Sequence, residues 1–526
     1  MRGPWRAIGL SLWLGLLPVL GALYLTVPVA PDHALFDYIA WSHLQGSALY
    51  ADVAEQNWPG AMLFHELGIR LFGVHFWTFR LIDYLVLQVL TFAGAGFLHR
   101  AGFRVAPWIF LIVYPALYVT TGMWTAGQRD IVAAGLLLAA AALVLPALRP
   151  VNPPEAPGWK QGGAQHLLAG GLIAVAVLMR PTYLSYLLGL IVLEGVRFPG
   201  ERERHSTPLR RAFFLMIGFA VPVSALVLAG AWTGSLDDFY EQTILFNLQA
   251  YQDEGSRLHL VARGAAMILE SWHWIAALAT IGLLSWFGAA GLSRALVMVL
   301  GLMATVLVSF LLQNKGFGYH LSGLLPVLCL LLAIMVDRVA LWWSSASTGP
   351  SRWGLGIALA SSLALITVGT ANKLASLRPQ AQALSEGRFE PYYNGEGRPS
   401  WAEVTEMVRL IREGTDPGQH VLQWGRLFEV GYLAERPSSF RFVSTPALGL
   451  LSDGFSGTDA WLAEVRNDLK SRPPAFVAID RTALASVHAP YHARPNAPEA
   501  ERIVVESLAD YEPVFETSST ILFQVK

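Results

Sequence analysis

The feature that most limits how this chain can fold is its series of long apolar runs. A helix needs about 20 apolar residues to cross the hydrocarbon layer of a bilayer. On that scale the sequence predicts eleven membrane-spanning helices, near residues 8–28, 76–97, 107–123, 130–147, 165–180, 182–196, 212–232, 265–289, 295–313, 321–336 and 354–371. The chain is 54% hydrophobic and only 14% charged, which is more apolar surface than one soluble core can bury. We therefore expect an α-helical polytopic membrane protein.

Charge and cysteine content exclude several classes of function. A net charge of −1 at neutral pH gives no bulk attraction to a polyanion, so nucleic acid is not an expected partner. The only cysteine, Cys329, lies within an apolar run. A single cysteine excludes an intrachain disulfide and any site built from several cysteines, including zinc and iron–sulfur sites.

The distribution of basic residues predicts the orientation, because Lys and Arg accumulate in cytoplasmic loops. If the N-terminus is inside, the inner loops collect most of them, namely Arg100, Arg104, Arg149, Lys160, Arg197, Arg202, Arg204, Arg210, Arg211, Arg294, Arg338 and Arg352. An odd number of spans then places both the loop "DHALFDY" and the C-terminal tail outside. The first run can also be read as a signal peptide ending in "VPVA", and its cleavage leaves the remaining orientation unchanged.

The chain is expected to have two domains. Residues 1–372 form the membrane module, whose first outer loop at 30–75 has apolar residues at helical spacing and predicts two helices on the membrane surface. Residues 373–526 alternate between helical and strand patterns: helices in "WAEVTEMVRLIREG" and "DAWLAEVRNDLKS", strands in "HVLQWG", "AFVAID", "YEPVFET" and "TILFQVK". This alternation indicates a small extracytoplasmic α/β domain.

Two carboxylates in the first outer loop, Asp32 and Asp37, are candidate catalytic bases. Transfer of a group onto a hydroxyl with inversion needs one base beside the nucleophile. The two residues are five apart, which is about 140° around a helix, so we expect only one to face a site. The structural alternatives are that Asp32 is the N-cap of a helix and that Asp37 lies on a solvated face.

Glu55 is a third carboxylate in the same loop, just before Pro59 and Gly60. It is a candidate to orient a substrate hydroxyl or to ligate a divalent cation, because oxygen ligands suit hard cations. The simpler interpretation is a surface carboxylate in a turn. Apart from such a cation, no cofactor is expected.

Cations stand at the outer ends of several spans, within the motifs "GQRD", "RPT" and "KGFGYH". Cations from separate turns on one membrane face can converge on a phosphate and neutralise its charge as it leaves. The alternative is that each of these side chains extends to the lipid headgroups. We assign Asp130 as substrate-orienting, and as candidate ligands of a donor phosphate Arg129, Arg180, Lys315, Tyr319 and His320.

Taken together, these motifs resemble the GT-C superfamily of membrane glycosyltransferases, especially bacterial relatives of protein O-mannosyltransferases, lipid A aminoarabinose transferases and rhizobial galacturonosyltransferases. The resemblance covers nearly the whole chain and includes "QWG…YLAERPSSF" in the tail. Two departures concern His33, where the family has Glu, and Asn57, where a Lys-Pro-Pro run is common. The resemblance also includes a series of residues after the first span, namely Tyr38, Ala40, Gly46, Tyr50, Asp52, Pro59, Gly60, Leu71, Phe72 and Gly73.

The resemblance implies a GT-C fold and an inverting transfer from a polyprenyl-phosphate-linked sugar to a hydroxyl of a lipid, glycan or protein, on the outer face of a bacterial inner membrane. It implies that Asp32 is the catalytic acidic residue, with Asp37 as the second candidate. It also implies that Arg129, Arg180 or Lys315 supplies the positive charge that a lysine of the Lys-Pro-Pro run supplies in the family. A transporter or flippase of lipid-linked glycans is the main alternative, and it predicts ionisable groups near mid-membrane and repeated halves. A catalytically inactive scaffold with a partner-binding tail is a third.

Overall fold

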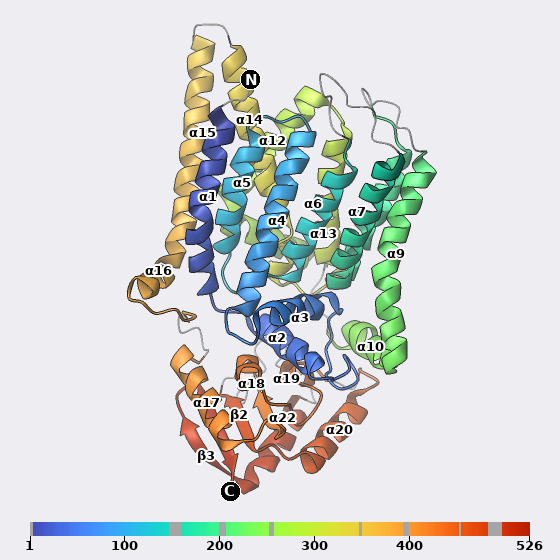
Figure 1. The fold of residues 1–526 in the computed structure, drawn as a ribbon, viewed down its shortest axis with the longest axis vertical. Helices are drawn as coiled ribbons and strands as arrows, with labels where there is room; N and C mark the ends of the chain where they lie inside the picture. Colours follow the sequence, from blue (N-terminus) through green and yellow to red (C-terminus); the bar gives the residue numbers. More distant parts are fainter. Residues whose placement is uncertain are drawn as a thin grey trace. The chain divides into compact units, whose positions relative to one another are not determined.

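A computed structural model describes residues 4–146, 159–198, 207–251, 257–346, 350–392, 399–451, 454–481 and 497–526. The chain divides into two compact units (Figure 1). The first unit contains Met1–Tyr24, Asp83–Leu226 and Gly255–Gln382, and the second contains Leu25–Ile82, Val227–Glu254 and Ala383–Lys526. The domain boundary expected at residue 372 stays a prediction.

The regular secondary structure in the described residues of the first unit is all helical. Every predicted apolar run coincides with a helix, and six helices (α4, α9, α12, α13, α14 and α15) are long and apolar enough to cross a membrane. The count of eleven spans stays a prediction. The main helices are α1 (Pro4–Leu25), α4 (Thr78–Arg100), α5 (Ala106–Val119), α6 (Arg129–Val144), α7 (Trp159–Met179), α8 (Leu184–Gly195), α9 (Pro208–Thr233), α12 (Arg257–Ala290), α13 (Arg294–Gln313), α14 (Leu324–Ser345) and α15 (Pro350–Leu374). Short turns of helix connect them at η1 (Pro181–Tyr183), η3 (Gly318–Leu321), η4 (Ala375–Leu377) and α16 (Arg378–Ser385).

Helices α7 and α9 approach each other through glycines. A Cβ atom at Gly218 would lie 1.9 Å from the carbonyl oxygen of Leu167, and one at Gly170 would lie 2.1 Å from that of Leu215. In a bilayer, apolar burial between helices gives little stabilisation, so close backbone approach at small residues becomes the main source of helix association. The two glycines therefore fix how these helices pack.

A carboxylate joins α14 to the start of α5. Asp337 accepts hydrogen bonds from the backbone N–H groups of Arg104 (2.7 Å), Val105 and Ala106 (3.0 Å). The first N–H groups of a helix have no partner within the helix. Asp337 supplies the missing acceptor, and it therefore caps the N-terminus of α5 although it lies far away in the sequence.

The second unit is an α/β structure. Its sheet has the order β1-β2-β4-β3, with β1 and β2 parallel and the other pairs antiparallel. Every helix and strand expected after residue 373 is confirmed, as are the two helices of the first outer loop. The strands are β1 (Val421–Trp424), β2 (Phe476–Asp480), β3 (Tyr511–Glu516) and β4 (Thr520–Val525). The helices are α2 (Pro31–Leu44), α3 (Gly60–Phe72), α10 (Leu236–Tyr240), η2 (Glu241–Leu245), α11 (Phe246–Gln249), α17 (Trp401–Gly414), α18 (Phe428–Ala434), α19 (Thr445–Leu448), α20 (Thr458–Ser471), α22 (Ala497–Ser507) and η5 (Leu508–Asp510).

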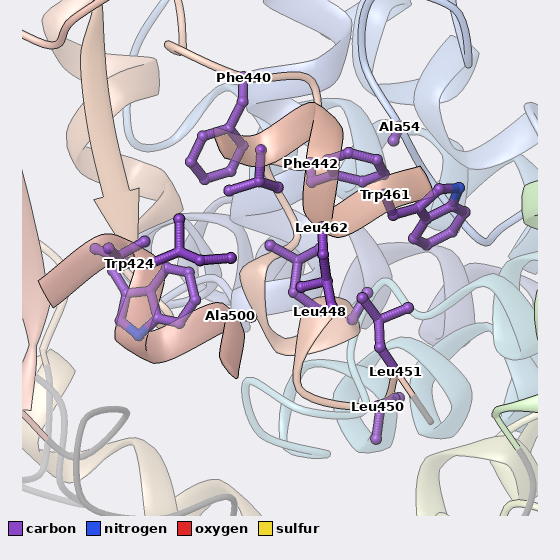
Figure 2. Close-up of a cluster of buried hydrophobic side chains, with 14 of the residues drawn as sticks. Ala54, Trp424, Phe440, Phe442, Leu448, Leu450, Leu451, Trp461, Leu462 and Ala500 are labelled. Atoms are coloured by element: carbon purple, nitrogen blue, oxygen red, sulfur yellow. The ribbon is translucent and has the colours of Figure 1, made fainter. Parts of the chain in front are cut away.

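Three distant segments build the core of this second unit. Figure 2 shows Ala54 from the first outer loop beside Phe442 and Trp461 of the C-terminal segment. Phe246 of α11 joins the same cluster, with its ring centroid 5.3 Å from that of Trp461. In a neighbouring cluster, Tyr38 of α2 is buried and donates a hydrogen bond to the carbonyl of Arg436 at 3.2 Å. The first outer loop and the tail therefore fold together.

We predict that Gly218→Ala lowers the free energy of unfolding by about 1–3 kcal/mol, because the added methyl group overlaps the Leu167 carbonyl. Gly189→Ala in α8 is the matched control, since no atom lies within 4 Å of its added Cβ, and a helical Gly→Ala change is stabilising by up to about 1 kcal/mol. Thermal unfolding in detergent compares the two variants. Equal melting temperatures would refute the close-packing argument.

Candidate functional site

The predicted site residues fall into two groups, one in each unit. The first unit holds Arg129, Asp130, Arg180, Lys315, Tyr319 and His320, and the second holds Asp32, Asp37 and Glu55.

An ion pair organises the group in the first unit. Arg180, in the turn after α7, donates from Nη2 to the carboxylate of Asp130 in the first turn of α6, and both side chains are buried. The other terminal nitrogen of Arg180 donates to Gln313 Oε1 at the end of α13, at 2.8 Å. Tyr183 donates to the backbone carbonyl of Asp130 at 3.2 Å. This network holds together the ends of three helices that are far apart in the sequence.

Three cations act on one buried histidine. His320 is only 1% exposed, and its pKa lies well below the usual value because of burial and because of the positive charges of Arg180, Lys315 and Arg129. Its imidazole is therefore neutral near pH 7. The three predicted cations thus each lie close enough to His320 to influence its pKa, and their convergence on a phosphate stays a prediction. We call Arg129, Arg180, Lys315 and His320 the cation cluster.

The turn that carries Lys315 has an unusual backbone. Asn314 ends α13 in the left-handed conformation (φ 49°), and Gly316 follows with φ 64°. Glycine adopts such angles without steric cost and asparagine tolerates them better than most residues. The turn reverses the chain within a few residues, so that Tyr319 and His320 follow in η3, where Phe317 and Tyr319 stack with centroids 5.4 Å apart.

A second network fixes the turn that precedes Arg129. Asp83 on α4 accepts hydrogen bonds from the hydroxyls of Tyr24 (2.5 Å) and Tyr118 (2.8 Å). The Tyr118 oxygen in turn accepts from the backbone N–H of Gly127 at 3.1 Å, and Gly127 has φ 81°. Asp83 therefore connects α1 and α5 to the "GQRD" turn.

A cavity of about 340 Å³ lies in the same unit and is lined in part by Tyr319. Helix α12 is broken beside it, since Trp272 has non-helical angles (φ −136°, ψ 21°) inside the helix. No residue pattern in the sequence predicts the break. The lining residues are Leu117, Thr120, Thr121, Trp124, Thr125, Met267, Ile268, Ser271, Trp272, Ile275, Gly318, Tyr319, Leu321, Leu325 and Lys373.

In the second unit, the structural alternatives for both aspartates are wrong. Asp32 is not the N-cap of α2: Ala30 occupies that position, and Asp32 lies half-buried in the first turn after Pro31. Asp37 is not on a solvated face, because it is 3% exposed. Helix α2 is buried on almost all sides by other residues of this unit, which an isolated helical pattern does not reveal.

Asp37 is paired with a histidine. Its Oδ1 lies 2.8 Å from Nδ1 of His65 on α3, and the His65 ring stacks on Phe79 with centroids 4.0 Å apart. Burial raises the pKa of Asp37, while the nearby positive charges of His65 and Arg80 oppose the rise without cancelling it. Asp37 is thus already engaged inside the fold, whereas Asp32 is the more accessible carboxylate.

Glu55 is also buried, at 2% exposed. Its Oε1 accepts hydrogen bonds from the backbone N–H (3.0 Å) and the side-chain amide of Asn57, and its backbone N–H donates to Gln242 at 2.9 Å. Among the described residues, no group of three or more metal-ligating side chains is placed to hold an ion. The roles of Glu55 in orienting substrate or in binding a divalent cation stay predictions.

The sequence interpretation missed two residues of the first unit. Gln313 completes the network around Arg180, and Lys373, near the end of α15, lines the cavity. Lys373 follows the last apolar run, where a single cation looks like an ordinary lipid-facing residue. No pattern in the sequence distinguishes the two roles.

We predict that Asp37→Asn does not lower thermal stability at pH 8, because the raised pKa means that the fold favours the protonated carboxyl. The stability due to this group is present below its unfolded pKa of 3.8 and is lost as the pH rises through the folded value. The melting temperature of the variant should therefore rise relative to wild type as the pH is raised above 3.8. A variant that is less stable than wild type at pH 8 would contradict this; Asp32→Asn serves as the control.

No protein-family model and no curated protein matches this sequence. ArnT from Cupriavidus metallidurans bound to undecaprenyl phosphate superimposes with a TM-score of 0.60 at 14% identity, covering 99% of this chain and 97% of ArnT. Its apo form gives 0.57 at 13% identity, covering 98% of each chain. An oligosaccharyltransferase from Archaeoglobus fulgidus gives only 0.48 at 11% identity, over 98% of this chain and 74% of the other, which does not establish a shared fold. The likeness to ArnT shows that this chain has the fold of ArnT.

Proposed function

We propose that this protein is a glycosyltransferase that moves a sugar from a polyprenyl-phosphate-linked donor to a hydroxyl acceptor, with inversion at the anomeric carbon. The observation that carries the proposal is the cation cluster, in which Arg129, Arg180 and Lys315 act on one buried histidine. Asp130 already pairs with Arg180 in this cluster, and three cations near one histidine can bind a further anion. A phosphate is the anion that the proposed donor supplies.

Unpaired polar atoms around the cluster support a bound oxygen-rich group. The side-chain amide of Gln128, the Nδ1 of His320 and the hydroxyl of Ser322 are buried and have no hydrogen-bond partner among the described residues. Each unpaired buried group costs about 1–3 kcal/mol. The oxygens of a phosphate accept hydrogen bonds from donors of this kind, in addition to the charge-assisted bonds from arginine and lysine.

In the proposed reaction, Asp32 takes the proton of the acceptor hydroxyl as its oxygen attacks the anomeric carbon. The bond from that carbon to the phosphate oxygen breaks, and the polyprenyl phosphate leaves with the electron pair. The cation cluster stabilises the negative charge that develops on this leaving group. Asp37 is the second candidate for the base, and its pairing with His65 makes it the less available one.

The fold is consistent with this activity. ArnT, which shares it, is known with undecaprenyl phosphate bound, and a lipid-held donor needs no nucleotide-binding motif. We place the protein in a bacterial inner membrane with its N-terminus inside and the C-terminal residues outside. The acceptor is a lipid, a glycan or a protein.

We predict that Asp32→Asn lowers the rate of sugar transfer by at least about 100-fold, the usual contribution of a positioned base, and leaves donor binding unchanged. Asp37→Asn should lower it far less. The assay supplies purified protein with synthetic undecaprenyl-phospho-sugars and extracted envelope lipids, and follows the product by mass spectrometry. Unchanged turnover in both variants would remove the proposed base, and movement of the donor across vesicles without any product would instead support a flippase.

We further predict that Arg129→Gln and Lys315→Gln each weaken binding of undecaprenyl phosphate by about tenfold, as expected when one charge-assisted hydrogen bond is lost. Binding of the anion should also raise the pKa of His320, because its negative charge opposes the effect of the three cations. Calorimetry at acidic pH, in buffers of different ionisation enthalpy, measures the resulting proton uptake. The phosphate can also take up protons on binding. His320→Gln should therefore abolish only the proton uptake that comes from the imidazole. Arg263→Gln, an exposed cation on α12, is the control; an equal loss of affinity in it would refute a specific cluster.

A further inference from the structure

The cavity beside Tyr319 has the size of a small ligand site. Its volume of about 340 Å³ lies at the lower end of the range of about 300–1,000 Å³ for ligand pockets. Its lining comes from the end of α5 and the turn after it, from the broken region of α12, from residues 318–325 and from Lys373. All of these belong to the first unit, and the helices can be followed in Figure 1.

The lining combines three kinds of side chain that suit a sugar. The indole rings of Trp124 and Trp272 offer flat apolar surfaces for the C–H face of a sugar ring, and threonine hydroxyls at 120, 121 and 125 can accept hydrogen bonds from sugar hydroxyls. The hydroxyls of Thr120 and Thr121 already donate to backbone carbonyls. A few polar groups among aromatic walls are typical of a specific small-molecule pocket. The cavity is therefore more than a gap between helices.

The charge carried by the described residues of the cavity lining is positive. Among the described residues that line the cavity, Lys373 is the only one with a full charge at neutral pH, and none of them is a carboxylate. A positive group in such a place attracts an anionic group of a ligand and repels a cationic one. Lys373 therefore bears directly on which ligand the cavity accepts.

The cavity and the cation cluster meet at consecutive residues. Tyr319 lines the cavity, and the next residue, His320, is the one on which Arg129, Arg180 and Lys315 act. A phosphate bound at the cluster would therefore have its attached sugar close to the cavity. Lys373 on α15 lines the cavity and is not among the cations that act on His320, so an anionic group on the sugar would match its charge.

We propose that this cavity receives the glycosyl headgroup of the donor and that Lys373 makes it selective for an anionic sugar, such as a uronic acid, against a cationic amino sugar. The inference rests on the proposed function and adds the class of sugar to it. The proposed contact is one charge-assisted hydrogen bond from the Lys373 ammonium to a carboxylate of the sugar.

The test is a charge-swap experiment on the full chain in nanodiscs. Labelled undecaprenyl phosphate is displaced by three synthetic undecaprenyl-phospho-sugars that carry a uronic acid, a neutral hexose or an amino sugar. The wild type should bind the uronosyl lipid at least about tenfold more tightly than the amino-sugar lipid. Lys373→Met should remove this preference, and Lys373→Glu should reverse it. Arg378→Glu, an exposed cation on α16, should leave it unchanged, and thermal unfolding checks that each variant is folded.

Three results would overturn parts of the argument, and they are distinguishable. If Lys373→Met and Lys373→Glu keep the wild-type ranking, Lys373 does not select the sugar. If Lys373→Met weakens binding of undecaprenyl phosphate without a sugar as much as binding of the uronosyl lipid, Lys373 contacts the phosphate. The proposed selectivity for an anionic sugar is then wrong. If wild-type protein binds no polyprenyl phosphate at all, the proposed function itself fails.

Discussion

The ion pair between Arg180 and Asp130 is the interaction on which the polar part of the first unit depends. Both side chains are buried, and breaking a buried pair by removing one partner is strongly destabilising because the other charge is left alone. The pair therefore fixes the start of α6 against the turn after α7, and Gln313 and Tyr183 add α13 and η1 to the same point. With this frame in place, Arg129 and Lys315 lie where their charges reach His320. Arg180 thus has a structural duty in addition to its proposed contact with phosphate, which is why its loss is a poor test of ligand binding.

The second unit depends on a different constraint, namely that segments far apart in the sequence must complete one core. Ala54, Phe246 and Trp461 share a cluster although they come from three separate segments. The carboxylates of the first outer loop are held by the same arrangement, because α2 packs against α18 and Tyr38 bonds to the carbonyl of Arg436. A substitution in the tail can therefore change the position of Asp32 or Asp37 without touching substrate. This gives the C-terminal segment a defined structural role whatever else it binds.

The sequence predicted local structure well and burial poorly, for physical reasons. Apolar runs and strand alternation depend on neighbouring residues, so the helices of the first unit and the strands β1 to β4 could be located. The influence of Arg129, Arg180 and Lys315 on one histidine agrees with the expectation that all three stand at turns on one membrane face. The burial of Asp37 could not, since the residues that cover α2 include some that come nearly 400 positions later. Lys373 was missed because the walls of its cavity come from several helices, and no single stretch of sequence contains them.

The shared core of the second unit also sets a problem of timing during biosynthesis. About 300 residues separate Ile82 from Ala383, the points where two contributing segments end and begin. At a synthesis rate of about 5–20 residues per second, the early segment waits about 15–60 seconds for its partner. Throughout that interval the apolar side chains of Phe36, Tyr38 and Ile39 lack the C-terminal residues that later cover them. The nascent chain is then most open to aggregation and to capture by a holding chaperone, and slowing translation of the intervening helices would lengthen that exposure.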